Sequence, residues 1–309
     1  MIVPIPSRSE RGDGTKTPLR HGGINRGAFA GRLLESIGDQ WRLARRPRLE
    51  HGWSSLCGTS HSRNQDAVVA DPPLFAVADG VGGGGAGELA SSQMLAWCQS
   101  VPKAAWSDEV ALAAWITQAD EVLAKSLQAL NPTGLSATIF AAAWVKPNGR
   151  GHIVHVGDAR ILQARARQGT WQIQQLTEDH TYANVGESPP AGGSDEDPAR
   201  MVGVGVIGSP PVHKIRLLEG EMLLFCSDGL HKFISPARMA EIVGRFGGLS
   251  QSLELVAKDM AHAALHAGSS DDISVLLVRR NPRFGARAVF WWMLSISVVL
   301  ALFGAAAVA

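Results

Sequence analysis

The sequence has few cysteines, few aromatic residues and no excess of charge of either sign. Its 309 residues include three cysteines, and the formal net charge is +1 at pH 7. Cys57, Cys98 and Cys226 are too few and too far apart for a disulfide framework or a zinc site, so we expect free thiols in a reducing compartment. A net charge near zero gives no field that attracts nucleic acid, and an acidic substrate must therefore be held by local groups.

The first 47 residues lack any apolar period. Arg8, Arg11 and Lys16 stand there among glycines and prolines. Such a segment buries too little apolar surface to offset the entropy lost on ordering, and we expect a disordered basic segment over residues 1–47. The segment also lacks the apolar core of a signal peptide, which argues against export.

The last residues, 288–309, lack charge altogether. Their sequence, AVFWWMLSISVVLALFGAAAVA, is apolar throughout. As a helix it would rise roughly 33 Å, against a hydrocarbon core of about 30 Å. Arg279, Arg283 and Arg287 precede it, and such residues stay on the cytoplasmic side. A core helix is the alternative, but it usually has one polar face. We expect a single-pass helix in the cell (inner) membrane, with the domain before it in the cytoplasm.

Residues 48–281 contain alternating strand-like and helix-like runs, and we expect them to form one domain. Apolar runs rich in β-branched residues predict strands, and the Asn148-Gly149 pair between two of them is a strong hairpin signal. The predicted strands are Ala67–Ala70, Leu74–Ala78, Ala137–Val145, His152–Val156, Arg160–Ala164, Trp171–Gln175, Lys214–Leu217, Met222–Cys226 and Ile273–Val278.

Apolar residues at helical spacing predict two pairs of helices. The predicted helices run from Gly87 to about Cys98, from a cap at Ser107, from the pair Ser235-Pro236, and from Ser250 to Gly268. Hairpins favour antiparallel sheets, and helices that arrive in pairs favour layers outside those sheets.

Aspartates stand at the ends of the apolar runs, beside glycine or small turn residues. Asp79, Asp158 and Asp228 each follow such a run, and Asp271 precedes the last one. A single Asp-Gly pair usually marks a turn. Several carboxylates that converged at strand ends would repel one another unless cations lay between them, and oxygen ligands suit Mg²⁺ or Mn²⁺. The residues alone leave turns and a divalent-metal site as alternatives.

An ordered series of motifs adds to this pattern. The series is Asn64–Asp66, Phe75–Gly83, Gly134–Thr138, Val156–Arg160, Leu176–His180, Ser227–Gly229 and Asp271–Val275. Each motif is weak alone, but the complete order is specific, and it resembles that of the bacterial-type PPM (PP2C-type) metal-dependent protein serine/threonine phosphatases. The resemblance implies an α/β (α+β) fold: a PP2C-like four-layer α-β-β-α sandwich with two antiparallel sheets.

The resemblance also implies roles for the carboxylates. Asp79 would bridge two metal ions, with the Gly80 carbonyl as a further ligand, and Asp228 and Asp271 would complete the two sites. Asp158 matches a position that helps to bind a third, weaker ion. The ions would be Mn²⁺ or Mg²⁺, two or three in number. They would lower the pKa of a shared water, so that hydroxide exists near neutral pH, and would stabilise charge on the phosphate.

Further roles follow from the same resemblance. Asp66 would hold metal-bound water, which makes Asp66, Asp79 and Asp228 the expected catalytic residues. Asp272 stands where the family usually has Asn, so we do not expect it to be a direct ligand.

The sequence departs from the family at the phosphate-binding position. His61 stands where an Arg usually grips the phosphate, so either His61 or the nearby Arg63 would bind it here. Val81 stands where eukaryotic members carry a His thought to protonate the leaving group. In this chain, water would donate that proton instead.

Other residues that could suggest chemistry have simpler interpretations. The loop Gly80–Gly87 lacks the ending of a phosphate-binding P-loop and the dinucleotide spacing, so its glycines let the backbone pass close to the metals. The segment Gly186–Arg200 predicts a flexible acidic flap that shapes substrate access. The histidines are dispersed, which argues against a histidine metal cluster: His152, His155, His180 and His213.

The expected function is hydrolysis of phosphoserine and phosphothreonine on proteins, at the cytoplasmic face of a membrane. The resemblance implies phosphorylated protein substrates and a serine/threonine protein kinase that acts on the same targets. One alternative is a catalytically inactive PPM-like domain that serves as a membrane-bound regulatory partner, and another is a hydrolase of small phosphoesters. The retained Asp79, Asp158, Asp228 and Asp271 argue against the inactive domain, because binding alone would not need them.

Overall fold

The structure is a computed structural model that describes residues 47–82, 86–132, 134–205, 207–245 and 252–282. Within these ranges, no helix has both the length and the apolar character needed to cross a membrane. The predicted disordered segment 1–47, except its last residue, and the predicted transmembrane helix 288–309 lie outside the described residues. The described residues cover the domain predicted over residues 48–281 except for 83–85, 133, 206 and 246–251.

Two antiparallel sheets form the centre of the described domain. The first contains five strands in the order β1-β10-β9-β6-β7, and the second contains five in the order β2-β3-β4-β5-β8. The first sheet is built from β1 (Leu49–Leu56), β6 (Arg160–Arg167), β7 (Thr170–Gln175), β9 (Met222–Cys226) and β10 (Ile273–Arg280). The second is built from β2 (Ala67–Asp71), β3 (Leu74–Gly82), β4 (Ser136–Val145), β5 (Arg150–Val156) and β8 (Val212–Arg216).

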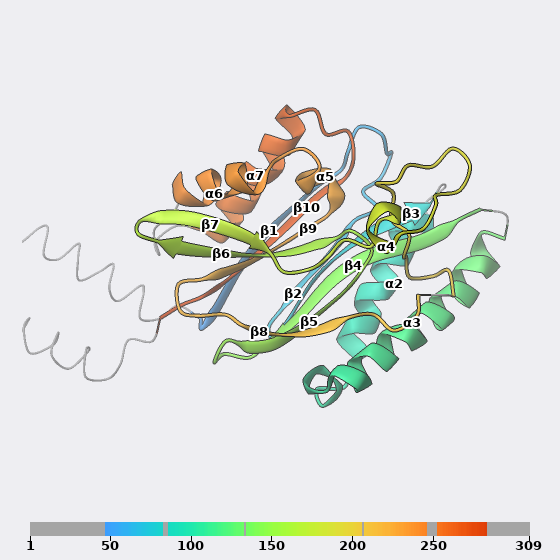
Figure 1. Ribbon diagram of the computed structural model, residues 1–309, viewed down its shortest axis with the longest axis horizontal. Helices are drawn as coiled ribbons and strands as arrows, with labels where there is room; N and C mark the ends of the chain where they lie inside the picture. The colour runs from blue at the N-terminus through green and yellow to red at the C-terminus, as the bar shows by residue number, and fades with distance from the viewer. Residues whose placement is uncertain (1–46, 83–85, 133, 206, 246–251, 283–309) are drawn as a thin grey trace, which may run out of the picture. The chain divides into compact units, whose positions relative to one another are not determined.

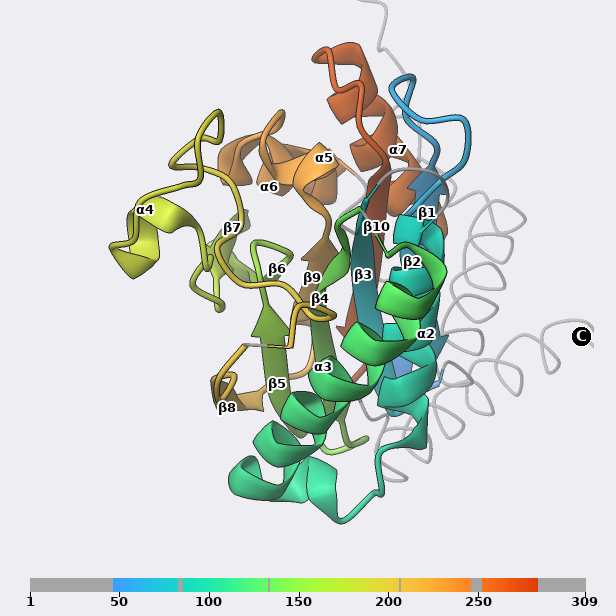
Figure 2. The ribbon, with the colours of Figure 1, turned by 90° about the vertical axis from the view of Figure 1, so that its right-hand side faces the viewer.

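Helices cover the outer face of each sheet, and Figure 1 shows α6 and α7 on one side and α2 and α3 on the other. Figure 2 shows α2 and α3 lying across the face of the second sheet. The helical elements are α2 (Ala86–Ser100), the short 3₁₀ helix η1 (Ala105–Ser107), α3 (Glu109–Leu130), α4 (Tyr182–Val185), α5 (Asp228–His231), α6 (Pro236–Arg245) and α7 (Leu253–His266). The arrangement is the expected α-β-β-α sandwich.

Alternation of side chains along the strands creates three apolar layers. On β3, Phe75 and Val77 pack between the two sheets, whereas Ala76 and Ala78 face α2 and α3. On β9, Phe225 likewise lies between the sheets while its neighbours face α6 and α7. Because side chains in a strand point alternately to opposite faces, strands buried on both faces read as continuous apolar runs, and this is why they were predictable.

Each predicted strand is present, with ends that differ by a few residues, but β1 was missed. Its sequence, LEHGWSSL, mixes polar residues with a glycine and gives no clear strand signal. A Cβ atom added to Gly52 would lie 2.2 Å from the backbone nitrogen of Glu254, so the start of α7 packs directly on this strand. β1 pairs with β10 in a register that joins Leu49 to Arg280 and Leu56 to Ile273.

The helix caps need two corrections. Asp108, not Ser107, caps α3, because its carboxylate accepts hydrogen bonds from the backbone nitrogens of Val110 and Ala111. The last helix begins at Leu253 after Ser252 and ends at His266, whereas the predicted cap Ser250 lies outside the described residues. The expected cap at Ser235 agrees with the structure, since its hydroxyl accepts from the Arg238 backbone nitrogen at 3.3 Å.

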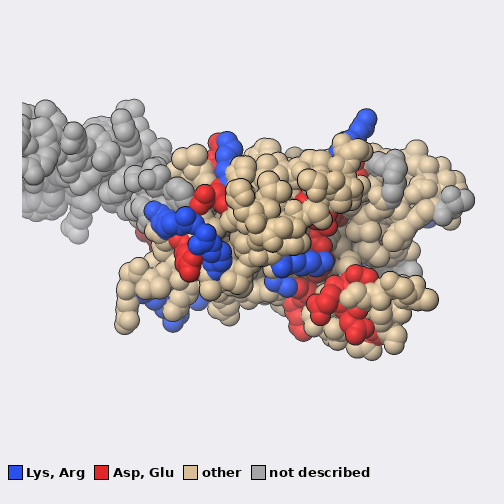
Figure 3. All heavy atoms as spheres, turned by 90° about the horizontal axis from the view of Figure 1, so that it is seen from above, with Lys and Arg blue, Asp and Glu red and all other residues tan. Residues whose placement is uncertain are grey.

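Charge is distributed without a dominant sign. On the face shown in Figure 3, acidic and basic side chains lie in separate small groups, and neither covers the surface. This agrees with the formal net charge of +1.

Candidate metal centre

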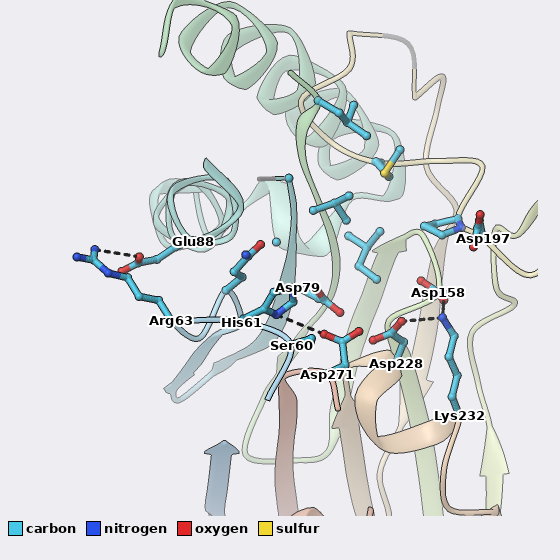
Figure 4. A pocket seen from close by; sticks show the side chains of 18 of the residues that line it. Ser60, His61, Arg63, Asp79, Glu88, Asp158, Asp197, Asp228, Lys232 and Asp271 are labelled. Atoms are coloured by element: carbon cyan, nitrogen blue, oxygen red, sulfur yellow. Dashed lines mark hydrogen bonds and ion pairs between the residues drawn. The ribbon is translucent and has the colours of Figure 1, made fainter. Parts of the chain in front are cut away.

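A pocket at one end of the sandwich collects the carboxylates that the sequence singled out. Asp79, Asp158, Asp228 and Asp271 all line it, together with Gly80. The two sheets contribute jointly, because Asp79 lies on β3 and Asp158 follows β5, while Asp228 follows β9 and Asp271 precedes β10. Figure 4 shows these carboxylates pointing toward a shared space. The structure therefore brings together residues that are distant in the sequence.

Asp79 lies inside β3 rather than at its end, which corrects the sequence-based expectation. It is paired with Ile139 of β4, and β3 continues to Gly82. The hydroxyl of Thr138 donates to the Asp79 carbonyl oxygen at 2.7 Å. A carboxylate in mid-strand, with its backbone held by β4, has little freedom to move away from its neighbours.

Gly80 sits where the chain passes close to the start of α2. A Cβ atom there would lie 2.1 Å from the Gly87 carbonyl oxygen, so only glycine fits. With its side-chain amide oriented to satisfy its neighbours, Gln65 donates to the Gly80 carbonyl oxygen at 2.8 Å. A carbonyl oxygen has two lone pairs, and one remains for the metal-ligand role predicted for Gly80.

Asp66 lies beside the other carboxylates at the start of β2. The Ser227 hydroxyl donates to its Oδ2 at 2.9 Å. The Asn64 side chain fixes the backbone at Asp66. Its Oδ1 accepts a hydrogen bond from the Asp66 backbone nitrogen at 2.9 Å, and its Nδ2 donates to the Ser55 hydroxyl at 2.7 Å. Ser227 and Asn64 thus fix Asp66 near the other carboxylates, although Asp66 is not among the residues that line the pocket.

The carboxylates repel one another in the absence of cations. Burial, and then the charges of neighbouring aspartates, raise the pKa of Asp79 well above its ordinary value. Burial raises the pKa of Asp66 to about 8, although hydrogen bonds from Ser274 and Ser227 oppose the rise. Burial, followed by the charge of Asp228, raises the pKa of Asp158 to about 6. These groups cannot all ionise at neutral pH unless positive charge joins them.

Several of the carboxylate oxygens are also without hydrogen-bond partners. Among the described residues, Oδ1 of Asp66, both oxygens of Asp158 and Oδ1 of Asp228 are buried and accept no hydrogen bond. Buried polar atoms are almost always partnered in proteins, so unpartnered oxygens on neighbouring carboxylates indicate a missing ligand. An all-oxygen set suits Mg²⁺ or Mn²⁺, and the residues present fit these ions.

Asp272 serves a different purpose from its neighbour Asp271. Its Oδ1 accepts from the Gly58 backbone nitrogen at 2.7 Å, and its Oδ2 accepts from the Gln65 backbone nitrogen at 2.7 Å. The carboxylate therefore ties the loop before β2 to the start of β10. Its occupied oxygens agree with the expectation that Asp272 is not a direct metal ligand.

His61 and Arg63, the two candidates for phosphate binding, lie differently. The His61 Nδ1 is 3.1 Å from Oδ2 of Asp272 and 3.6 Å from Oδ1 of Asp271, at the edge of the carboxylates. Arg63 is 77% exposed and pairs with Glu88 at 3.7 Å, and Figure 4 shows it pointing away from the carboxylates. Both line the pocket, but His61 lies next to its acidic part.

Lys232 belongs to the site and was missed in the sequence. Its Nζ lies 2.7 Å from Oδ2 of Asp228 and 3.6 Å from Oδ2 of Asp158. Burial opposes ionisation of Asp228, but the charge of Lys232 and its hydrogen bond overcome this and lower the Asp228 pKa. A signal was available, since residues four apart in a helix are neighbours, and Lys232 follows Asp228 at that spacing.

The predicted flap Gly186–Arg200 reaches the pocket. Pro190, Asp197 and Pro198 are among the residues that line it. At the base of the segment, Arg200 forms an ion pair with Glu187 at 2.5 Å. Its position beside the carboxylates agrees with the expected influence on substrate access, which stays a prediction.

Comparison with known proteins places this arrangement in context. The family described as protein phosphatase 2C matches residues 57–265. The chain is 29% identical, over 234 residues, to the serine/threonine phosphatase stp of Listeria innocua, which covers 68% of this chain and 85% of that protein. It is 28% identical to the PPM Ser-Thr phosphatase MsPP of Mycobacterium smegmatis, whose structure in complex with cacodylate gives a TM-score of 0.60 over 74% of this chain and 97% of that one.

A further solved structure shares the fold. The catalytic domain of the serine/threonine protein phosphatase PstP, in complex with two manganese ions, has a TM-score of 0.61 at 24% identity. The similarity covers 76% of this chain and 99% of that chain.

Proposed function

The chain belongs to the protein phosphatase 2C family, and we propose that it hydrolyses phosphoserine and phosphothreonine esters on proteins with Mn²⁺ or Mg²⁺ as cofactor. The observation that carries the proposal is the convergence of Asp66, Asp79, Asp158, Asp228 and Asp271, several of whose buried oxygens have no partner among the described residues. The names of the relatives, which are serine/threonine phosphatases, support the same reaction.

The protein's own residues would orient the reaction. Bound divalent cations would supply an activated water and neutralise phosphate oxygens. Asp79, fixed within β3, and Asp228 and Asp271 from the other sheet would hold those cations between the two sheets. Asp66, held by Ser227, would accept a proton or a hydrogen bond from the attacking water. His61 would contact the phosphate from the edge of the carboxylates.

A turnover assay tests the proposal. The full chain should release phosphate from phosphoserine and phosphothreonine peptides when Mn²⁺ is present and lose this activity in EDTA. Asp79→Asn and Asp228→Asn should abolish it. Asp259→Asn is a matched control, because Asp259 pairs with Arg245 on the surface at 3.6 Å and should leave turnover unchanged. A wild-type protein that bound Mn²⁺ but did not turn over any phosphoester would favour an inactive regulatory domain.

A second assay distinguishes a protein phosphatase from a hydrolase of small phosphoesters. A protein phosphatase should prefer phosphopeptides to small phosphoesters in a competition assay with p-nitrophenyl phosphate. The open pocket and the flap beside it favour a peptide, because both leave room for residues on either side of the phosphorylated one. Equal use of both substrates would indicate a hydrolase of small phosphoesters.

We also propose that residues 288–309 anchor the chain in the inner membrane with the catalytic domain in the cytoplasm, where a serine/threonine protein kinase acts on the same targets. The apolar, uncharged sequence after Arg287 supports the anchor. Deleting residues 288–309 should move the protein from the membrane fraction to the soluble fraction. A truncated protein that stayed with membranes would contradict the anchor without affecting the proposed reaction.

A further inference from the structure

Lys232 brings a positive charge into the carboxylate pocket. Its Nζ lies between two carboxylates, 2.7 Å from Oδ2 of Asp228 and 3.6 Å from Oδ2 of Asp158. The side chain of Asp158 is 2% exposed and that of Asp228 is 16% exposed, so both need a partner more than surface carboxylates do. Figure 4 shows the lysine side chain extending toward these two residues.

The backbone fixes the relative positions of these groups. Asp228 begins α5, and the Lys232 backbone nitrogen donates to the Asp228 carbonyl oxygen at 3.0 Å, one helical turn away. The His231 Nε2 lies 2.9 Å from the carbonyl oxygen of Asp158, which ties α5 to the end of β5. The helical turn and this contact fix the backbone positions of the lysine and both aspartates, and the partly exposed Lys232 side chain spans the remaining distance.

Asp158 depends on this lysine for its charge balance. Neither of its carboxyl oxygens has a hydrogen-bond partner in the described part of the chain. Lys232 is the cation with which the structure pairs it, and the same ammonium donates to Oδ2 of Asp228. The ammonium therefore supplies a positive charge next to both carboxylates.

Building on the proposed function, we propose that the Lys232 ammonium takes the position between Asp158 and Asp228 that a third divalent cation would otherwise occupy. The centre then binds two ions, and Asp158 pairs with the lysine rather than with a metal. A fixed monovalent charge replaces an exchangeable divalent one, so the number of bound ions does not depend on how much free metal is available.

Counting bound manganese tests the inference independently of activity. The full-length protein in detergent is dialysed against Mn²⁺, and bound metal is measured by elemental analysis and by native mass spectrometry. We expect two ions in the wild type, two in Lys232→Arg, and three in Lys232→Met, which keeps the length of the side chain but removes the charge. Asp158→Asn should still bind two, because Asp158 pairs with the lysine.

A matched lysine provides the control. Lys258 pairs with Glu254 at 2.7 Å over the same four-residue spacing, but on the surface of α7. Lys258→Met should bind two ions, as the wild type does. If Lys232→Met does not fold, as judged by circular dichroism, Lys232→Gln takes its place with the same expected count.

The outcomes separate this inference from the proposed function. Three ions in the wild type, a count that stays at two in Lys232→Met, or a count that falls in Asp158→Asn would each overturn the role of Lys232, while an active enzyme with either count would leave the proposed function intact. A wild-type protein that bound no Mn²⁺ would overturn the metal centre itself.

Discussion

The layer between the two sheets is apolar, whereas the pocket at its end is lined by carboxylates. The layer consists of tightly packed carbon side chains such as Phe75, Phe225 and Leu276. One residue pair links it to the pocket, since Ile139 belongs to the layer and is paired with Asp79 across β3 and β4. The layer stabilises the fold at any metal concentration, whereas the carboxylates oppose folding until cations bind. Stability and chemistry should therefore respond to different substitutions.

The largest effect should come from the apolar layer. Phe225→Ala removes a fully buried ring between the sheets and should lower the free energy of unfolding by about 3–5 kcal/mol. Chemical denaturation with and without Mn²⁺ should give the same loss, because the ring does not contact the pocket. A loss confined to the metal-free protein would show that the apolar layer and the pocket are not independent.

A carboxylate in the pocket should behave in the reverse way. Asp79→Asn should reduce turnover by at least about 100-fold, which corresponds to roughly 2.7 kcal/mol of transition-state stabilisation. The same substitution removes a carboxyl group whose ionisation is opposed by burial and by four neighbouring aspartates, so the melting temperature in EDTA at pH 8 should rise. Differential scanning fluorimetry measures this, and a lower melting temperature would contradict the repulsion.

The stability of the metal-free protein should depend on pH through the carboxylates of the pocket. In the metal-free folded state Asp66 and Asp158 keep their protons up to about pH 8 and about pH 6, whereas an unfolded chain releases them near pH 4. The folded state binds more protons between these values, so stability should fall as pH rises from about 4 to about 8. Mn²⁺ should stabilise the protein more at pH 8 than at pH 5, because ions compete with protons for the carboxylates. Melting curves at both pH values check this.

The smallest effect should come from Asp272, which ties the loop before β2 to the start of β10. Asp272→Asn keeps one acceptor oxygen but turns a donor toward a backbone N–H, so it should cost about 1–2 kcal/mol of stability. The loop that holds His61 should loosen, and KM for a phosphopeptide should rise more than kcat falls. Steady-state kinetics tests this, and an unchanged KM would argue against a role for His61 in phosphate binding.

Much of this architecture was predictable from the sequence. Strands buried on both faces appear as continuous apolar runs, and the motifs occur in a specific order, so both can be recognised without knowledge of distant contacts. The strands around Asp158 and Asp228 were found in this way, and the two-sheet sandwich agrees with the resemblance. The rest depended on contacts between distant segments. β1 has a weak strand signal and is fixed by pairing with β10. Asp79 is fixed by pairing with β4, and no local sequence pattern indicates that pairing. The charge of Lys232 matters only because α5 and the end of β5 meet.

The pairing of β1 with β10 also determines how far the ends of the described domain lie from the carboxylates. Leu49 and Arg280 lie side by side at one end of that ribbon, and Leu56 and Ile273, close to the acidic residues, lie at the other. A strand of this length spans roughly 25 Å. Both connections that leave the domain therefore depart from the end remote from the reacting groups. The membrane attachment proposed above would therefore join the domain at the end opposite to the carboxylate pocket.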